Sequence, residues 1–218
     1  MNKEWSELNK TMQAQIKKKN TYKIGIETLL SLRRQLMQTL ISFKEDLCRE
    51  DFNSSPFINT DGYHSKTIAY SIWHIFRIED IVVHTVINED EQVFFAGNYQ
   101  KRINSPIITT GNELIKQQIV DFSKQLNLEE LYTYIFEVQK STEKMLEQLS
   151  YDELKRKIPE ERKGYVESLN VVNNNENAIW LIDYWCHKDI RGLIQMPLSR
   201  HWIMHTEACL RIKNKIHL

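Results

Sequence analysis

Two histidines four residues apart, His201 and His205, are the residues of this sequence best placed to do chemistry. They share an apolar stripe with the i, i+3, i+4, i+7 spacing of one helical face: Leu198, His201, Trp202, His205, Ala208, Cys209, Ile212 and Ile216. Both imidazoles are therefore expected to point into a core, one turn apart. Because an unpartnered buried polar group costs about 1–3 kcal/mol, each ring needs a partner. One metal ion held by both rings would supply it, and hydroxyl groups or backbone carbonyls are the alternative.

A third donor must come from another element, and the helix predicted over residues 65–88 offers one. At about 100° per residue, Ile75 and Ile78 lie within the buried arc of this helix, and His74 lies at its flank, where a neighbouring helix would pack. His74 is thus the preferred third ligand on physical grounds. The other candidates are His64, His84, His187, His217, Cys186, Cys209 and the carboxylates.

The same helix carries further charged residues, which the periodicity divides between two sides. Arg77, Asp80 and His84 fall on a narrow polar side that is expected to face water. Glu79 falls on the buried arc, which is unusual for a carboxylate. It could hydrogen-bond a ligand imidazole or occupy a coordination position itself.

The remaining cysteines and the tryptophans are expected to serve packing. Cys186 and His187 are adjacent in the sequence. Because the side chains of consecutive helical residues point in different directions, we do not expect these two to form a nucleophile dyad. Cys209 is expected to be a small core residue. The tryptophans expected to anchor the core are Trp73, Trp180, Trp185 and Trp202.

The elements that position these residues are predicted to be helices. Periodicity and capping signals predict helices over about 4–18, 22–47, 65–88, 110–125, 128–149, 177–194 and 197–216, with a short helix after the capping box at 150–153. Residues 89–111 and 159–176 are predicted to be connections. We therefore expect an all-α fold, a four-helix bundle with an N-terminal helical extension (1–20) and short extra helices in the connections, forming one domain over 1–218.

Composition narrows the function classes. Only 6 Gly and 4 Pro disfavour a turn-rich β fold, and 29 basic residues balance 29 acidic ones, which argues against a nucleic acid or a membrane surface as the main partner. Three cysteines fit a reducing compartment better than a disulfide framework. The absence of an apolar leader or a long apolar run leads us to expect a cytoplasmic protein.

The two histidine elements together resemble the DinB-like superfamily, which includes YfiT-type proteins. Residues 71–80 (Ser-Ile-Trp-His-Ile-Phe-Arg-Ile-Glu-Asp) are similar to its first motif, and 200–205 (Arg-His-Trp-Ile-Met-His) to its second. The resemblance covers about residues 22–216, and its specificity comes from the order and separation of the two short motifs. The extension 1–20 and the long connection 150–176 depart from the pattern, and both could reshape the mouth of a site.

This resemblance implies a set of properties for the chain. His74, His201 and His205 would form a metal triad for a divalent ion such as zinc, nickel or iron, in a four-helix bundle that is frequently a homodimer. Characterised branches are transferases and isomerases that use bacillithiol, mycothiol or a related low-molecular-weight thiol. The implied partners are therefore a small-molecule substrate and such a thiol.

The leading functional expectation is a metal-dependent, thiol-using transferase. A divalent ion would lower the pKa of a thiol, and the thiolate would attack an electrophilic carbon, while Glu79 would orient a ligand ring or receive a proton. Metal-dependent hydrolysis is a variant that uses the same site. One rival is a non-catalytic, stress-related binding or scaffold protein with a structural metal. Its apolar first helix would contact partners through Trp5 and Leu8. Another rival is a regulator that binds a small molecule in an apolar pocket lined by Trp73 and Trp202. Whether residues 89–111 cover the site as a lid stays open.

Overall fold

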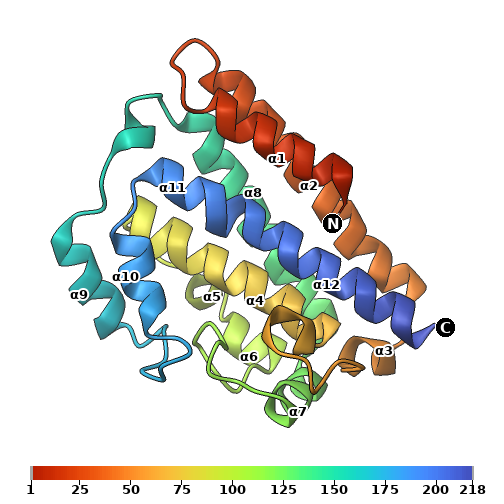
Figure 1. The fold of residues 1–218 in the computed structure, drawn as a ribbon. Coiled ribbons are helices and arrows are strands. Elements are labelled where there is room, and N and C mark those ends of the chain that lie inside the picture. The colour runs from red at the N-terminus through yellow and green to blue at the C-terminus, as the bar shows by residue number, and fades with distance from the viewer. Residues whose placement is uncertain (1, 218) are drawn as a thin grey trace.

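The computed structural model describes residues 2–217, and in that range the protein is built from helices (Figure 1). Its elements are α1 (Lys3–Gln15), α2 (Tyr22–Asp46), α3 (Arg49–Asn53), η1 (Gly62–Ser65), α4 (Ile68–Asp80), η2 (Ile81–Asn88), α5 (Val93–Ala96), α6 (Tyr99–Ile103), α7 (Gln117–Gln125), α8 (Leu128–Gln148), η3 (Glu153–Lys155), α9 (Glu160–Ser168), α10 (Trp180–Cys186), α11 (Ile190–Gln195), η4 (Met196–Arg200) and α12 (His201–Ile216). No strand occurs between residues 2 and 217. The expectation of an all-α fold is confirmed.

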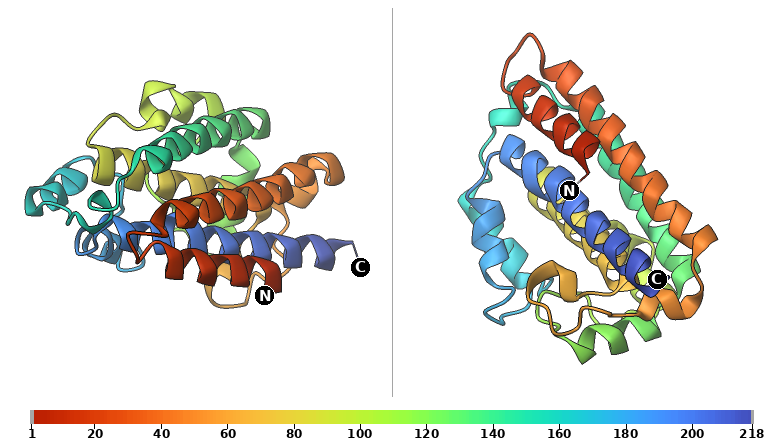
Figure 2. Two further views of the ribbon diagram at one scale, coloured as in Figure 1. Left: turned by 90° about the horizontal axis from the view of Figure 1, so that it is seen from above. Right: turned by 45° about the vertical axis from the view of Figure 1, so that its right-hand side comes forward.

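The central helix is α4, which contacts α12 on one side and α8 on another (Figures 1 and 2). The Thr67 side chain caps its first turn by accepting a hydrogen bond from the Tyr70 amide (3.1 Å). The helix is buried all round and continues as the π-helical segment η2, which ends where Glu89 adopts φ 64°. α2 contacts α8 and α12. The Tyr132 hydroxyl of α8 donates to the Leu40 carbonyl of α2 at 2.7 Å.

The N-terminal extension forms a helix that packs on the rest of the chain. α1 and α2 lie side by side and antiparallel (Figures 1 and 2). Trp5, Met12 and Ile16 are buried there. Gly25 allows the close approach, because a Cβ atom at this position would lie 2.6 Å from Cγ2 of Ile16.

The connection 159–176 contains α9, one of the short extra helices expected in the connections. Two boundary predictions are wrong. The capping box predicted at 110–113 does not begin a helix, because α7 starts at Gln117 and Gly111 adopts φ 76°. The helix predicted over 177–194 is interrupted, because Asp189 caps α11 by accepting a hydrogen bond from the Gly192 amide (2.8 Å).

The prediction that the polar side of this helix faces water is also wrong, because the connection after η2 covers that side. Arg77 and Asp80 are fully buried and His84 is 5% exposed. The Asp80 carboxylate accepts hydrogen bonds from the backbone amides of Val93 and Phe94 (2.8 and 2.9 Å) at the start of α5. Folding of residues 89–103 over α4 therefore replaces water as the partner of these charges.

None of the helices between residues 2 and 217 is both long and apolar enough to span a bilayer.

Candidate metal centre

The structure brings together the three histidines that the sequence singles out. His74 comes from α4, and His201 and His205 come from the first turns of α12. One ring nitrogen of each lies within 4.8 Å of the others, and all three side chains are buried. The group could hold a metal ion.

One pair of ring nitrogens has the separation that a shared metal ion requires. Nε2 of His74 and Nε2 of His201 lie 3.2 Å apart. Two nitrogens that each lie about 2.0–2.1 Å from one zinc ion, in tetrahedral directions, are about 3.3 Å apart. The ring of His205 approaches both others, with centroid separations of 4.8 Å to His74 and 4.5 Å to His201. Three nitrogens from two helices therefore converge on one point.

Burial keeps the three rings in the protonation state that ligates metals. Desolvation lowers the pKa of His201 to about 4 and lowers the pKa values of His74 and His205 well below the usual range. All three imidazoles are thus neutral at pH 7. A neutral imidazole offers one nitrogen lone pair to an ion, and three of them leave coordination positions open.

A backbone carbonyl fixes the tautomer of His74. Nδ1 of His74 lies 2.7 Å from the Thr110 carbonyl oxygen, so this nitrogen carries the proton and donates it, and the Nε2 lone pair faces the other histidines. The Tyr70 ring stacks on His74 (centroids 5.3 Å apart, planes at 13°), and its hydroxyl donates to the Gly111 carbonyl at 2.9 Å. The end of the 89–111 connection thus holds the first ligand in place.

A local helical irregularity places His201 at the start of α12. The π-helical segment η4 precedes it and begins with Met196 and Pro197, and Pro197 has no N–H to donate to the preceding turn. The Ser199 hydroxyl lies 2.9 Å from the Ile194 carbonyl and 3.0 Å from the Gln195 carbonyl, so these two acceptors share its one proton. The Leu198 carbonyl instead accepts a hydrogen bond from Arg33 of α2 (3.1 Å).

Arg33 and Glu79 form a fully buried ion pair beside the triad. The Arg33 guanidinium donates to both Glu79 oxygens (2.7 and 2.8 Å), and the Trp202 indole N–H donates to Oε2 of Glu79 at 2.7 Å. Arg33 also stacks over the Trp202 ring, 4.2 Å from its centroid. Because Trp202 follows His201 in the chain, these contacts make Glu79 a positioning residue for α12. A proton-accepting role for Glu79 stays a prediction.

The sequence reasoning missed Arg33 as a functional residue. Arg33 has the same helical spacing as the apolar residues of the 22–47 helix, and this placement was a signal. A cation within one apolar stripe and a carboxylate on another buried arc each require an opposite charge, and pairing the two satisfies both.

A pocket of about 450 Å³, lined by both charged and apolar residues, reaches the triad at His74 and His205. Lys66 and Lys116 bring positive charge to it, and Asp61 brings a negative charge. Burial lowers the pKa of Lys66 and raises that of Tyr70, which stays protonated at neutral pH.

A second pocket of about 310 Å³ reaches all three histidines and is predominantly apolar. Its aromatic wall comes from α10, with Trp180, Tyr184 and Trp185. The expected core role of Trp180 is wrong, because this side chain is 49% exposed. An apolar pocket beside the histidines was expected to be lined by Trp73 and Trp202, but both are fully buried elsewhere in the core.

The other predicted candidates lie outside the triad. His84 contacts Asp90 and Ser141, and His64 accepts a hydrogen bond from Arg211. Cys209 is a buried core residue, as expected, and burial raises the pKa of its thiol to about 12. Both pockets are lined by residues between positions 58 and 205, so the N-terminal extension does not shape them.

In comparisons with known proteins, no family model matches the chain and no curated protein is significantly similar to it.

Proposed function

We propose that this protein is a metal-dependent enzyme that acts on a small molecule, most simply as a thiol-dependent transferase of the DinB-like type built on a four-helix bundle. One observation carries the proposal: three neutral imidazoles converge where a pocket with charged residues in its lining and a predominantly apolar pocket meet. Structural zinc sites are closed by four protein ligands, whereas catalytic sites keep a position open. A three-histidine group reached by two pockets favours an enzyme over a scaffold with a structural metal.

We assign separate roles to the residues around the site. His74, His201 and His205 would hold the ion, which supplies Lewis acidity and lowers the pKa of a thiol or a water molecule. The Thr110 carbonyl and the Glu79 contacts orient the ligand-bearing helices. Lys66 and Lys116 would receive an anionic or polar part of the reactants, and Trp180 and Tyr184 an apolar part. Zinc, nickel and iron all suit three nitrogen donors.

Metal content tests the site. Protein produced without a His tag should carry about one divalent ion per chain by inductively coupled plasma mass spectrometry, and His201→Ala should lose it while the circular dichroism spectrum stays helical. His187→Ala is the matched control, because His187 is exposed and outside the triad, and it should retain the ion. Stoichiometric metal in His201→Ala would contradict the assignment, and loss of the whole fold would indicate a structural metal.

Turnover tests the reaction class. Metal-loaded protein is offered model electrophiles with and without a low-molecular-weight thiol, and we expect product only when the thiol is present. Product without thiol would reject the transferase and support the hydrolase alternative, which shares the same site. No turnover with either nucleophile across electrophile classes would favour a binding protein.

The expected homodimer and the cytoplasmic location stay predictions. Sedimentation equilibrium of the full chain measures the first, and fractionation of the source cells measures the second.

A further inference from the structure

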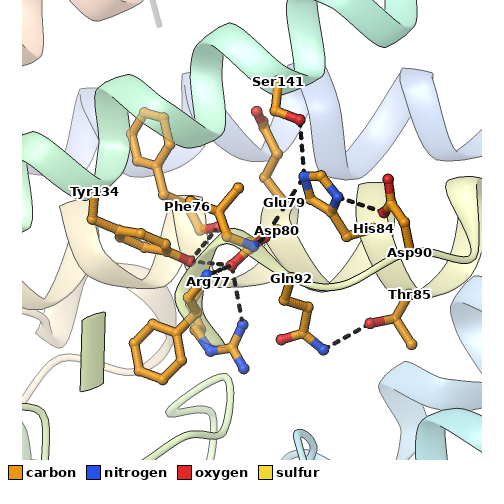
Figure 3. Close-up of polar contacts among 12 residues, drawn as sticks. Phe76, Arg77, Glu79, Asp80, His84, Thr85, Asp90, Gln92, Tyr134 and Ser141 are labelled. Atoms are coloured by element: carbon orange, nitrogen blue, oxygen red, sulfur yellow. Dashed lines mark hydrogen bonds and ion pairs between the residues drawn. The ribbon is translucent and has the colours of Figure 1, made fainter. Parts of the chain in front are cut away.

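A second group of reactive side chains lies away from the histidine triad, around His84 (Figure 3). His84 belongs to η2 and follows His74 by ten residues on a continuous helical path, which corresponds to about 15 Å. Its ring joins Ser141 of α8 to Asp90, which lies just after η2. None of these residues lines the pockets of the metal centre.

The contacts run in the order serine, histidine, aspartate. Nδ1 of His84 lies 2.6 Å from Oδ1 of Asp90, so this nitrogen carries the proton and donates it. Nε2 then accepts, and the Ser141 hydroxyl donates to it at 3.0 Å. A hydroxyl hydrogen-bonded to an imidazole that a carboxylate orients is the arrangement that activates a serine nucleophile.

Ser141 departs from the usual behaviour of a hydroxyl within a helix. Such hydroxyls commonly bond to the carbonyl four residues earlier, and Thr133 on the same helix does so, donating to Glu129 at 3.0 Å. Ser141 instead points out of α8 toward His84 (Figure 3). The hydroxyl is therefore directed to the imidazole rather than to its own helix.

The rest of the polar network holds the imidazole and its partner in place. The Asp90 amide donates to the His84 carbonyl at 2.9 Å, which ties the carboxylate to the helix that bears the ring. Asp80 also faces His84, with Oδ1 4.0 Å from Nε2. That carboxylate is occupied by the Tyr134 hydroxyl at 2.9 Å and by the two amides of α5, so Ser141 is the closer partner of Nε2.

A pocket of about 550 Å³ opens beside this group, and Ser141 and Asp90 both line it. Ile87 and Met145 give it an apolar part, Lys144 and Arg156 bring positive charge, and Glu89 and Glu153 bring negative charge. Either cation could stabilise a developing oxyanion that forms beside it. The volume suits a small molecule rather than a polymer.

We propose that Ser141 is a nucleophile activated by His84, with Asp90 as its positioning residue, and that the adjoining pocket accepts small carboxylic esters. Oγ of Ser141 bonds to the ester carbonyl carbon while its proton passes to Nε2 of His84. The carbon–oxygen bond to the alcohol then breaks, and the alcohol leaves with that proton. Water then attacks the acyl carbon and gives a proton to Nε2 of His84, the bond between that carbon and Oγ of Ser141 breaks as Oγ takes this proton, and the acid leaves. The sum is ester plus water to acid plus alcohol.

A fluorophosphonate probe tests the nucleophile without requiring knowledge of the natural ester. Attack by Ser141 forms an oxygen–phosphorus bond and expels fluoride, and mass spectrometry locates the adduct on the peptide. We expect one adduct, on Ser141, in wild-type protein, and the same extent of labelling when that protein is treated with a chelator. Ser141→Ala should abolish the labelling, and Thr133→Ala, the matched control on α8, should leave it unchanged.

Variants of the other two residues separate catalysis from packing. Asp90→Asn, at a half-exposed side chain, should slow labelling at least about tenfold and lower kcat for p-nitrophenyl acetate hydrolysis with little change in KM. His84→Gln should behave likewise where it folds. Absence of an adduct on Ser141 in folded wild-type protein, or equal labelling of Ser141 in Asp90→Asn, would overturn the proposal and leave an ordinary structural hydrogen-bond chain. Labelling that depends on metal would assign the activity to the other site.

Discussion

At the scale of single residues, the most consequential feature is the charge pair buried next to the triad. Arg33 and Glu79 are both completely buried, and each satisfies the other. Removing one member of such a pair leaves an uncompensated charge in a medium of low dielectric constant, whereas replacing both with apolar groups of similar volume can be nearly neutral. The pair therefore allows a test that distinguishes positioning from chemistry.

We expect Glu79→Leu to lower the free energy of unfolding by about 3–5 kcal/mol, because the buried Arg33 charge then has no opposite charge beside it. The double variant Arg33→Met/Glu79→Leu should recover much of that loss. Urea unfolding followed by circular dichroism measures both. A double variant less stable than the single one would contradict this account.

The same double variant examines the role of Glu79. If Glu79 acts by positioning, the folded double variant binds metal more weakly, since Trp202 and η4 lose their anchors. If Glu79 receives a proton during turnover, metal affinity is kept and kcat falls alone.

At the scale of elements, the loop that ends at Gly111 is as important to the triad as the two helices. It delivers the Thr110 carbonyl to His74, and it does so with a glycine at φ 76° packed against Trp73 and Tyr70. A Cβ atom at Gly111 would lie 2.9 Å from the Trp73 ring and 3.0 Å from the Tyr70 ring. Both the dihedral angle and the available space therefore require glycine.

Gly111→Ala should weaken metal affinity about 10–100-fold, the usual effect of losing the outer partner of a ligating histidine. Competition with a chromophoric chelator measures it. Gly164→Ala is the control, because a Cβ atom there meets nothing within 4 Å, and its affinity should equal that of the wild type. Unchanged affinity in folded Gly111→Ala would show that the carbonyl does not position His74.

The sequence could predict those features of the elements that depend on neighbouring residues, but not those that depend on segments distant in the sequence. Apolar periodicity is local, so it placed His74 and His201 on buried faces. The cover over Arg77 and Asp80 is not local, because it comes from the folding back of residues 89–103, and periodicity therefore assigned these residues to water. The Thr110 and Glu113 pair has the spacing of a capping box, but Thr110 uses its carbonyl for His74 and the next residue has a positive φ.

At the scale of the whole molecule, the extension belongs to the core. Trp5 is 5% exposed, so the idea that this apolar helix meets partners through Trp5 is wrong. The extension also covers Glu207 of α12, which lies off the apolar stripe of that helix. Glu207 is buried and accepts a hydrogen bond from the Asn2 amide, because the start of the chain lies over it.

The triad joins α4 to α12, which are far apart in the sequence, so a bound ion should act as a cross-link between them. A ligand that binds only the folded state stabilises it by about 4 kcal/mol at a thousand times its Kd. In a chain of this size that energy corresponds to a Tm shift of about 8–16 °C. We therefore expect a chelator to lower the Tm of wild-type protein by about this amount, and to leave the Tm of His74→Ala and His201→Ala unchanged. Both variants should melt near the chelated wild type, because each helix alone keeps too few donors to hold the ion. Equal Tm values for metal-loaded and chelated wild type would mean that the ion does not link these helices, and a chelator effect that persists in both variants would place the ion elsewhere.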